Sequence, residues 1–173
     1  MDAAFRREQV LEAIASSEAP LSASTLAADL KVSRQIIVGD VALLRAQGQD
    51  IIATARGYTI PSFAETGQYL GRLACHHDSN DLAKELYTMV DLGATVVNVI
   101  VEHELYGEIT GQLNLKSRDD VDQFVARYRS SNMRLLSELS QGIHLHTVAC
   151  QDKTHFDQVH QGLQAKGYLY PLE

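Results

Sequence analysis

The sequence predicts an α+β protein of two units, in which three helices and a β-hairpin precede an open sheet with helices packed on one face. The first part of the chain repeats apolar side chains at helical spacing and ends in two short apolar segments around a turn. The second part reads as β-α-β-β-α-β-α, an order typical of an α/β sandwich. Ser62 to Gly67 between them is polar and follows Pro61. We therefore expect domains at 1–62 and 66–173.

The composition is that of a soluble globular protein, with 45% apolar and 21% charged residues. No apolar run is long enough to span a bilayer, and the N-terminus enters a helical pattern without an apolar signal region. Two cysteines, Cys75 and Cys150, do not make a disulfide framework. These features predict a cytoplasmic protein without membrane association.

The net charge of −7 argues against nonspecific coating of nucleic acid, but a small basic patch on an acidic body still permits specific binding. Residues 1–66 carry six Lys and Arg against eight Asp and Glu, a net of −2. The remainder carries nine against fourteen, a net of −5. This asymmetry indicates two units with different roles.

Three helices are predicted in the first unit, over residues 4–16, 22–30 and 33–47. Ser22 and Ser33 are suited to cap the second and third helices. The third should bury a stripe of Ile37, Val41 and Leu44, with Ile36 and Leu43 alongside. Two helices joined by so short a turn predict a helix-turn-helix. The hairpin predicted over 51–60, with Arg56 near its tip, completes a winged helix-turn-helix.

The third helix carries the residues expected to bind DNA. A recognition helix reads base edges near its N-terminus, where Arg and Gln can make bidentate contacts to guanine and adenine. Asp40 should point away from the groove. The residues predicted to contact DNA are Ser33, Arg34, Gln35, Val38, Arg45 and Arg56, with Ala42 on the same face. The alternative is a winged helix used for protein contacts.

Strands in the second unit are predicted at 68–75, 94–101, 108–115 and 142–148, and helices at 81–92, 117–130 and 154–166. The strand at 94–101 is so apolar that it should be central. Residues 133–139 fit either a helical turn or a strand, and 168–170 fit a short edge strand.

His144 and His146 lie two residues apart on one predicted strand, so both point to the same face, about 7 Å apart along the chain. Two imidazoles on one face could form half of a metal site. The run Cys75-His76-His77-Asp78 and the later Glu85 offer a third imidazole and a carboxylate. One alternative is a solvated strand face. Another is a thiolate site, since Cys75 shares a face with His77 and Cys150 with His146.

Two groups of residues carry a resemblance to a known family. Residues 33–48, continuing to Arg56-Gly57-Tyr58, resemble the winged helix of the niacin-responsive repressors. The second unit is similar to the three-histidine domain of that family in the segments His77 to Glu85, Val101-Glu102-His103, Tyr106-Gly107-Glu108-Ile109 and Gly142-Ile143-His144-Leu145-His146-Thr147.

The resemblance implies a homodimeric repressor that binds operator DNA and controls genes for NAD biosynthesis or niacin uptake, with nicotinic acid as co-repressor. It also implies one divalent transition metal per chain, held by His77, Glu85, His144 and His146. Nickel, zinc and iron all suit that ligand set. Glu104-Leu105 stands where the family has Pro-Val, so the effector fit of this loop departs from the pattern.

His103 and Tyr106 are the predicted effector-binding residues, because they flank a turn at the end of the central strand. His103 could hydrogen-bond a small anionic aromatic acid or reach an open position on the metal. It could equally be a hydrogen-bonded loop histidine. Two other functions compete with the repressor: a metal-responsive regulator and a metal-dependent hydrolase fused to a DNA-binding unit. We expect no enzyme activity, because no general base lies beside the ligands.

Overall fold

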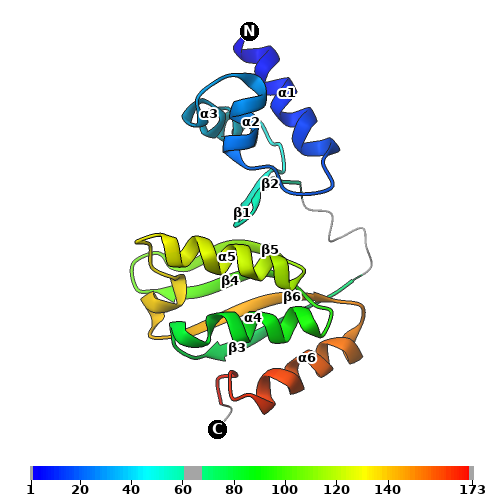
Figure 1. Ribbon diagram of the computed structural model, residues 1–173, viewed down its shortest axis with the longest axis vertical. Coiled ribbons are helices and arrows are strands. Elements are labelled where there is room, and N and C mark those ends of the chain that lie inside the picture. Colours follow the sequence, from blue (N-terminus) through cyan, green and yellow to red (C-terminus); the bar gives the residue numbers. More distant parts are fainter. Residues whose placement is uncertain (1, 61–67, 172–173) are drawn as a thin grey trace. The chain divides into compact units, whose positions relative to one another are not determined.

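The structure of the protein, a computed structural model, describes residues 2–60 and 68–171 (Figure 1). The chain divides into two compact units, residues 1–62 and 63–173, which are described separately below. The predicted linker, Ser62 to Gly67, lies outside the described residues. Helices and antiparallel strands build the protein, and the predicted α+β class is confirmed.

The N-terminal unit consists of α1 (Ala3–Ser16), α2 (Ala23–Leu30), α3 (Arg34–Ala46) and a hairpin of β1 (Ile52–Thr54) and β2 (Gly57–Thr59). Both predicted caps form. The Ser22 hydroxyl accepts from the Thr25 amide at 3.0 Å, and the Ser33 hydroxyl accepts from the Ile36 amide at 3.3 Å. Each satisfies an amide that the first helical turn leaves unpaired. The core of the unit includes Val10, Ile14, Leu26, Ile37, Val41 and Leu44.

One part of the core prediction is wrong. Ile36 and Leu43 were expected beside the buried stripe of α3 but are 41% and 51% exposed. Asp40, which is buried, lies between them and the stripe on the helix surface. Its carboxylate accepts two hydrogen bonds from Arg6 of α1, at 2.6 and 3.1 Å, so the apolar stripe ends at this ion pair.

The hairpin is fixed to the loop before α2. Leu21 and Tyr58 exchange two backbone hydrogen bonds, of 2.9 and 2.7 Å. Gly57 has φ +134°, and a Cβ there would lie 2.5 Å from the Leu21 carbonyl. Only glycine fits so close to a neighbouring backbone in this conformation.

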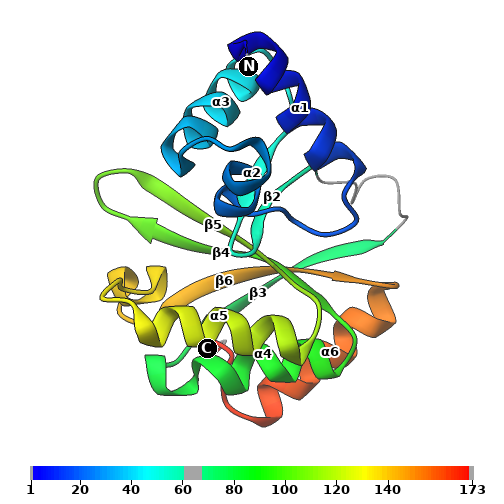
Figure 2. The same ribbon diagram turned by 45° about the horizontal axis from the view of Figure 1, so that its top comes forward.

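The C-terminal unit contains β3 (Tyr69–His76), α4 (Leu82–Asp91), β4 (Thr95–His103), β5 (Gly107–Leu115), α5 (Arg118–Ser130), β6 (Ile143–Cys150) and α6 (Lys153–Ala165). The order β-α-β-β-α-β-α is the predicted one. Its strands pair antiparallel in the spatial order β5-β4-β6-β3, so β4 is internal, as its apolar sequence indicates. Helices α4, α5 and α6 cover one face of this sheet (Figure 2).

Two short segments complete the unit. The ambiguous stretch before β6 forms a 3-10 helix, η3 (Leu136–Ser140). The C-terminal segment adds a short edge beside β3, where the His76 amide donates to the Tyr168 carbonyl and the Tyr170 amide to Ala74, both at 2.8 Å. No helix among the described residues is long and apolar enough to cross a membrane.

The strand register decides which side chains lie under the helices. Leu73 pairs with His146 and Cys75 with His144 across β3 and β6, and Val99 of β4 pairs with His146 on the other side. Paired residues point to the same face of a sheet. That face also carries the buried Val96, Val148 and Leu115. The histidines of β6 therefore point into the core between the sheet and its helices.

Candidate metal centre and nucleic-acid interface

Four side chains from three parts of the C-terminal unit meet in this core. His144 and His146 come from β6, His77 follows β3, and Glu85 lies in the first turn of α4. The turn between His77 and Glu85 is the 3-10 helix η2 (Ser79–Asp81), capped by Asp78, whose carboxylate accepts from the Asn80 amide at 2.9 Å. This turn reverses the chain, so that Glu85 faces the sheet.

The three imidazoles converge on the Glu85 carboxylate through their Nε2 atoms. Nε2 of His146 lies 2.5 Å from Oε1, and Nε2 of His144 lies 3.0 Å from Oε2. Nε2 of His77 also contacts Oε2. Glu85 is 0% exposed and His144 and His146 are 4% and 3% exposed, so the cluster is shielded from water.

The other nitrogen of each ring faces a backbone carbonyl. Nδ1 of His77 lies 2.7 Å from the Asp78 oxygen, that of His144 2.9 Å from the Gly142 oxygen, and that of His146 2.8 Å from the Asn98 oxygen. A carbonyl oxygen only accepts, so each Nδ1 carries the hydrogen and donates it. In the neutral ring the Nε2 atoms then present lone pairs.

Three lone pairs directed at a carboxylate, which also only accepts, require a positive charge between them. A proton on His146 supplies such a charge in the metal-free protein, and a divalent cation would supply it in its place. Histidines whose second nitrogen is held by a carbonyl are the usual ligands of protein metal sites. The donor set of this cluster thus fits a transition metal.

Electrostatics in the cluster follow from this arrangement. Burial alone would raise the pKa of Glu85, but the charge of His146 and hydrogen bonds from His144 and His146 outweigh burial, and the pKa is lowered. Burial likewise works to lower the pKa of His146, but the Glu85 carboxylate outweighs it, and the pKa is raised above 6.5. Glu85 and His146 thus stabilise each other's charged forms.

Two backbone features position the rings, and sequence reasoning missed both. Asn98 sits at an irregularity in β4, where its side-chain oxygen accepts from the Thr147 amide at 3.0 Å while its carbonyl holds His146. Gly142 has φ +88°, and a Cβ there would lie 2.6 Å from the His77 carbonyl. The one available signal for Asn98 was its place as a polar residue in an otherwise apolar strand.

Of the two cysteines, the structure brings only Cys75 to the cluster. Cys75 is fully buried opposite His144. Burial, followed by the nearby Glu85 charge, raises the pKa of its thiol. Cys150 lies four residues beyond His146 on β6, about 13 Å along the strand.

His103 and Tyr106 do not meet the cluster. His103 lies four residues beyond Val99, the partner of His146, which places it about 13 Å along β4. Its Nδ1 accepts from the amides of Leu105 and Tyr106 at 3.1 and 3.3 Å, so its Nε2 carries the hydrogen when the ring is neutral. The Tyr106 side chain is 73% exposed, and the two rings lie 5.2 Å apart. His103 therefore stabilises the β4–β5 turn, and it is too far along the strand to be a ligand of this cluster.

In the N-terminal unit, α3 presents the predicted polar side chains outward. Arg34, Gln35 and Arg45 are exposed, and Asp40 is turned into the protein by Arg6. Val38 differs from expectation, because it is half-buried and packs against the core. The middle of the exposed face is lined instead by Gly39 and Ala42.

Arg56 occupies the tip of the hairpin between β1 and β2. Its amide donates to the Thr54 hydroxyl at 3.1 Å, and that hydroxyl donates to the Gly57 carbonyl at 2.8 Å. These bonds fix a two-residue turn. Arg56 itself is half-buried.

Comparison with known proteins matches both units. The HTH domain family matches residues 6–59, and the 3H domain family matches residues 71–172. The transcription repressor NadR of Bacillus subtilis (strain 168) is 39% identical over 168 residues, 96% of this chain and 93% of that protein. The probable transcription repressor NiaR of Thermotoga maritima is 37% identical over 165 residues, 95% of this chain and 93% of that protein.

Proposed function

Because the chain belongs to the family of transcription repressors that join an HTH domain to a 3H domain, we propose that it represses genes for NAD biosynthesis or niacin uptake, with nicotinic acid as co-repressor. The family makes the chain a DNA-binding regulator rather than an enzyme, so the hydrolase alternative is set aside. The proposal adds an effector, a metal and a dimer to this role.

One observation carries the metal: three Nδ1 atoms bound to carbonyls leave three Nε2 lone pairs directed at one buried carboxylate. His77, Glu85, His144 and His146 would hold the ion. Nitrogen and oxygen donors of this kind suit nickel, zinc or iron. The bound ion would supply a fixed positive charge that joins the end of β3, the start of α4 and β6.

The DNA contacts would come from the exposed face of α3 and from the tip of the hairpin. Arg34 and Gln35 would reach base edges at the start of the recognition helix, and Ser33, Arg45 and Arg56 would contact phosphates. Two copies of the chain would place two recognition helices in successive major grooves, about 34–36 Å apart. A homodimer therefore predicts a palindromic operator.

The effector would bind at the β4–β5 turn. Since Nδ1 of His103 is occupied by two amides, Nε2–H is a donor suited to a carboxylate, with the Tyr106 ring beside it. Nicotinic acid supplies a carboxylate and an aromatic face. Effector and operator are then coupled through one free energy, so each tightens binding of the other by the same factor.

Fluorescence anisotropy with DNA from upstream of the regulated genes tests the proposal. Operator affinity should rise with nicotinic acid and with metal, and should fall after chelation. Nicotinamide, which lacks the carboxylate, is the matched control ligand. His77→Ala should remove the metal effect, while His76→Ala, the neighbour that faces away on an exposed surface, should keep it. Equal nicotinic acid affinities with and without operator would disprove the coupling.

A metal-responsive regulator is the second candidate, because the four cluster residues meet without any contribution from His103 or Tyr106. In that case metal alone would change operator affinity, and nicotinic acid would add nothing. Metal that stays bound without nicotinic acid, and whose addition leaves operator affinity unchanged, would exclude this candidate.

A further inference from the structure

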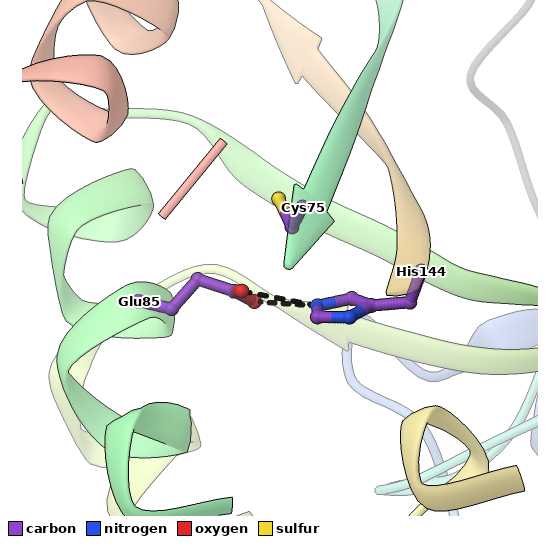
Figure 3. A group of neighbouring side chains, drawn as sticks. All are labelled: Cys75, Glu85 and His144. Atoms are coloured by element: carbon purple, nitrogen blue, oxygen red, sulfur yellow. Dashed lines mark hydrogen bonds and ion pairs between the residues drawn. The ribbon is translucent and has the colours of Figure 1, made fainter. Parts of the chain in front are cut away.

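A thiol lies among the candidate metal ligands. The Cys75 sulfur, a carboxylate oxygen of Glu85 and a ring nitrogen of His144 all lie within 4.8 Å of one another (Figure 3). Cys75 stands on β3 directly opposite His144, and the ring of His144 points to the Glu85 carboxylate on α4. Three elements of the fold therefore direct potential ligand atoms to one point.

The two cysteines of the chain are both buried but differ in their surroundings. The other cysteine, Cys150, is equally buried on the same sheet face, but no group of potential metal ligands among the described residues includes it. Cys75 also forms no disulfide. A buried cysteine in an apolar core is inert, whereas a thiol beside imidazoles and a carboxylate can become a metal ligand.

Charge favours the thiol as a ligand. A divalent cation held by three neutral imidazoles and one carboxylate leaves a net charge of about +1 in a site shielded from water. Coordination by a thiolate makes the site neutral. In that step the sulfur–hydrogen bond breaks, the sulfur–metal bond forms and the proton leaves to solvent.

We propose that Cys75 is a fifth protein ligand of the metal, so that this chain binds it through three imidazoles, a carboxylate and a thiolate. This inference rests on the proposed metal site and extends it. The thiolate would shift selectivity toward softer ions, favouring zinc over iron or manganese. It would also hold a coordination position that an anionic ligand must compete for.

Titration of the full chain with Co²⁺ tests the inference, because bound cobalt absorbs in the visible range and a cobalt–thiolate bond adds a charge-transfer band in the near ultraviolet. The wild type and Cys150→Ser should show both signals. Cys75→Ser should keep the visible bands and lose the charge-transfer band, and its zinc affinity should fall at least about 10-fold.

The outcomes separate the two proposals. Visible bands without a charge-transfer band in the wild type would overturn the role of Cys75 and leave the four-ligand site intact. Absence of both signals would overturn both. If Cys75→Ser does not fold, the Cys150→Ser protein still decides the question, since Cys75 is then the only thiol in the chain.

Discussion

Each unit of this protein buries a carboxylate that faces basic side chains, Asp40 in one and Glu85 in the other, and the two are neutralised in different ways. Asp40 in α3 receives two hydrogen bonds from the Arg6 guanidinium, a group that keeps its charge at any pH in the working range. Glu85 in α4 faces three imidazoles, which carry charge only when protonated. The N-terminal unit is therefore complete in itself, while the C-terminal unit requires either protons or a metal ion.

The two units should therefore differ in how their stability depends on pH and metal. A buried charge paired with a permanently charged side chain of the same unit stabilises one structure, and that stability changes little with pH or metal. A buried charge paired with titratable ligands makes the stability of the unit depend on what occupies the site. The unit predicted to bind effector is the one whose core depends on solution conditions.

Removing the Glu85 carboxylate of the C-terminal unit should have the largest effect on metal affinity. Glu85→Gln keeps the shape but loses the charge that balances the metal, so metal affinity should fall by more than about 100-fold. With metal at about 100 times its Kd, the free energy of unfolding of the wild type should rise by about 2.7 kcal/mol, and that of the variant should barely change. Competition with a chromophoric chelator and thermal melts measure both quantities.

Asp40→Asn is the matched control for that experiment. It removes the carboxylate buried in the N-terminal unit, so that unit should melt at a lower temperature while metal affinity stays at the wild-type value. An equal loss of metal affinity in both variants would contradict the contrast between the two units.

The second largest effect should be a change of stability with pH, whose direction differs between the metal-free and the metal-bound protein. The raised pKa of His146 stabilises the metal-free fold below 6.5, and this contribution is lost as pH rises through the raised value. The lowered pKa of Glu85 stabilises it above 4.5, and this contribution is lost as pH falls through the lowered value. The metal-free protein should thus be most stable between 4.5 and 6.5.

Metal binding requires unprotonated imidazoles, so metal affinity should rise over the pH range in which the metal-free fold weakens. The difference in melting temperature with and without metal should therefore widen above pH 6.5. Melts inside the acidic window and well above it, with metal or chelator, measure this. A difference that does not change with pH would mean that protons and metal do not compete for the cluster.

Local sequence signals were enough to predict most of the fold. Caps at Ser22 and Ser33, glycine at turns and the two kinds of periodicity locate the helices and strands, and the apolar run of β4 indicates an internal strand. Ile36 and Leu43 show the limit, because periodicity does not reveal that Asp40 ends the buried stripe. That depends on Arg6, 34 positions away in the sequence.

In the candidate site, too, local sequence predicts some features, and others depend on contacts between distant residues. Alternation along a strand predicts that His144 and His146 share a face, but not that Asn98 and Gly142 hold their rings, because those contacts depend on an irregular strand and on a turn with positive φ. Cys75 has the right parity for the cluster, as does Cys150. Only the pairing of Cys75 with His144 distinguishes them.

Substitution of His103 should have a smaller effect, and one confined to nicotinic acid binding. Its Nδ1 accepts from two backbone amides and the residue lies about 13 Å along β4 from the cluster, so metal affinity should be unchanged in His103→Asn and His103→Ala. The asparagine side chain can still accept from the turn amides but lacks the Nε2 donor. Both variants should therefore lose nicotinic acid affinity, by about 10-fold for one hydrogen bond to a charged group. Calorimetric titration of metal and of nicotinic acid measures the two affinities separately.

The smallest expected effect is that of a substitution at Gly39, next to Asp40 in the N-terminal unit. Gly39 is in the interior of α3, and a Cβ built there meets no atom within 4 Å. Alanine in an exposed helix interior is about 0.5–1 kcal/mol more stable than glycine, so Gly39→Ala should raise the free energy of unfolding by that amount in denaturant titrations. Because Gly39 lies between Gln35 and Ala42 on the exposed face of α3, the added methyl group should meet the operator rather than the protein. Operator affinity should then fall while stability rises. If both rise together, DNA does not approach the helix closely at this residue, and the reading face lies nearer to Arg34 and Arg45.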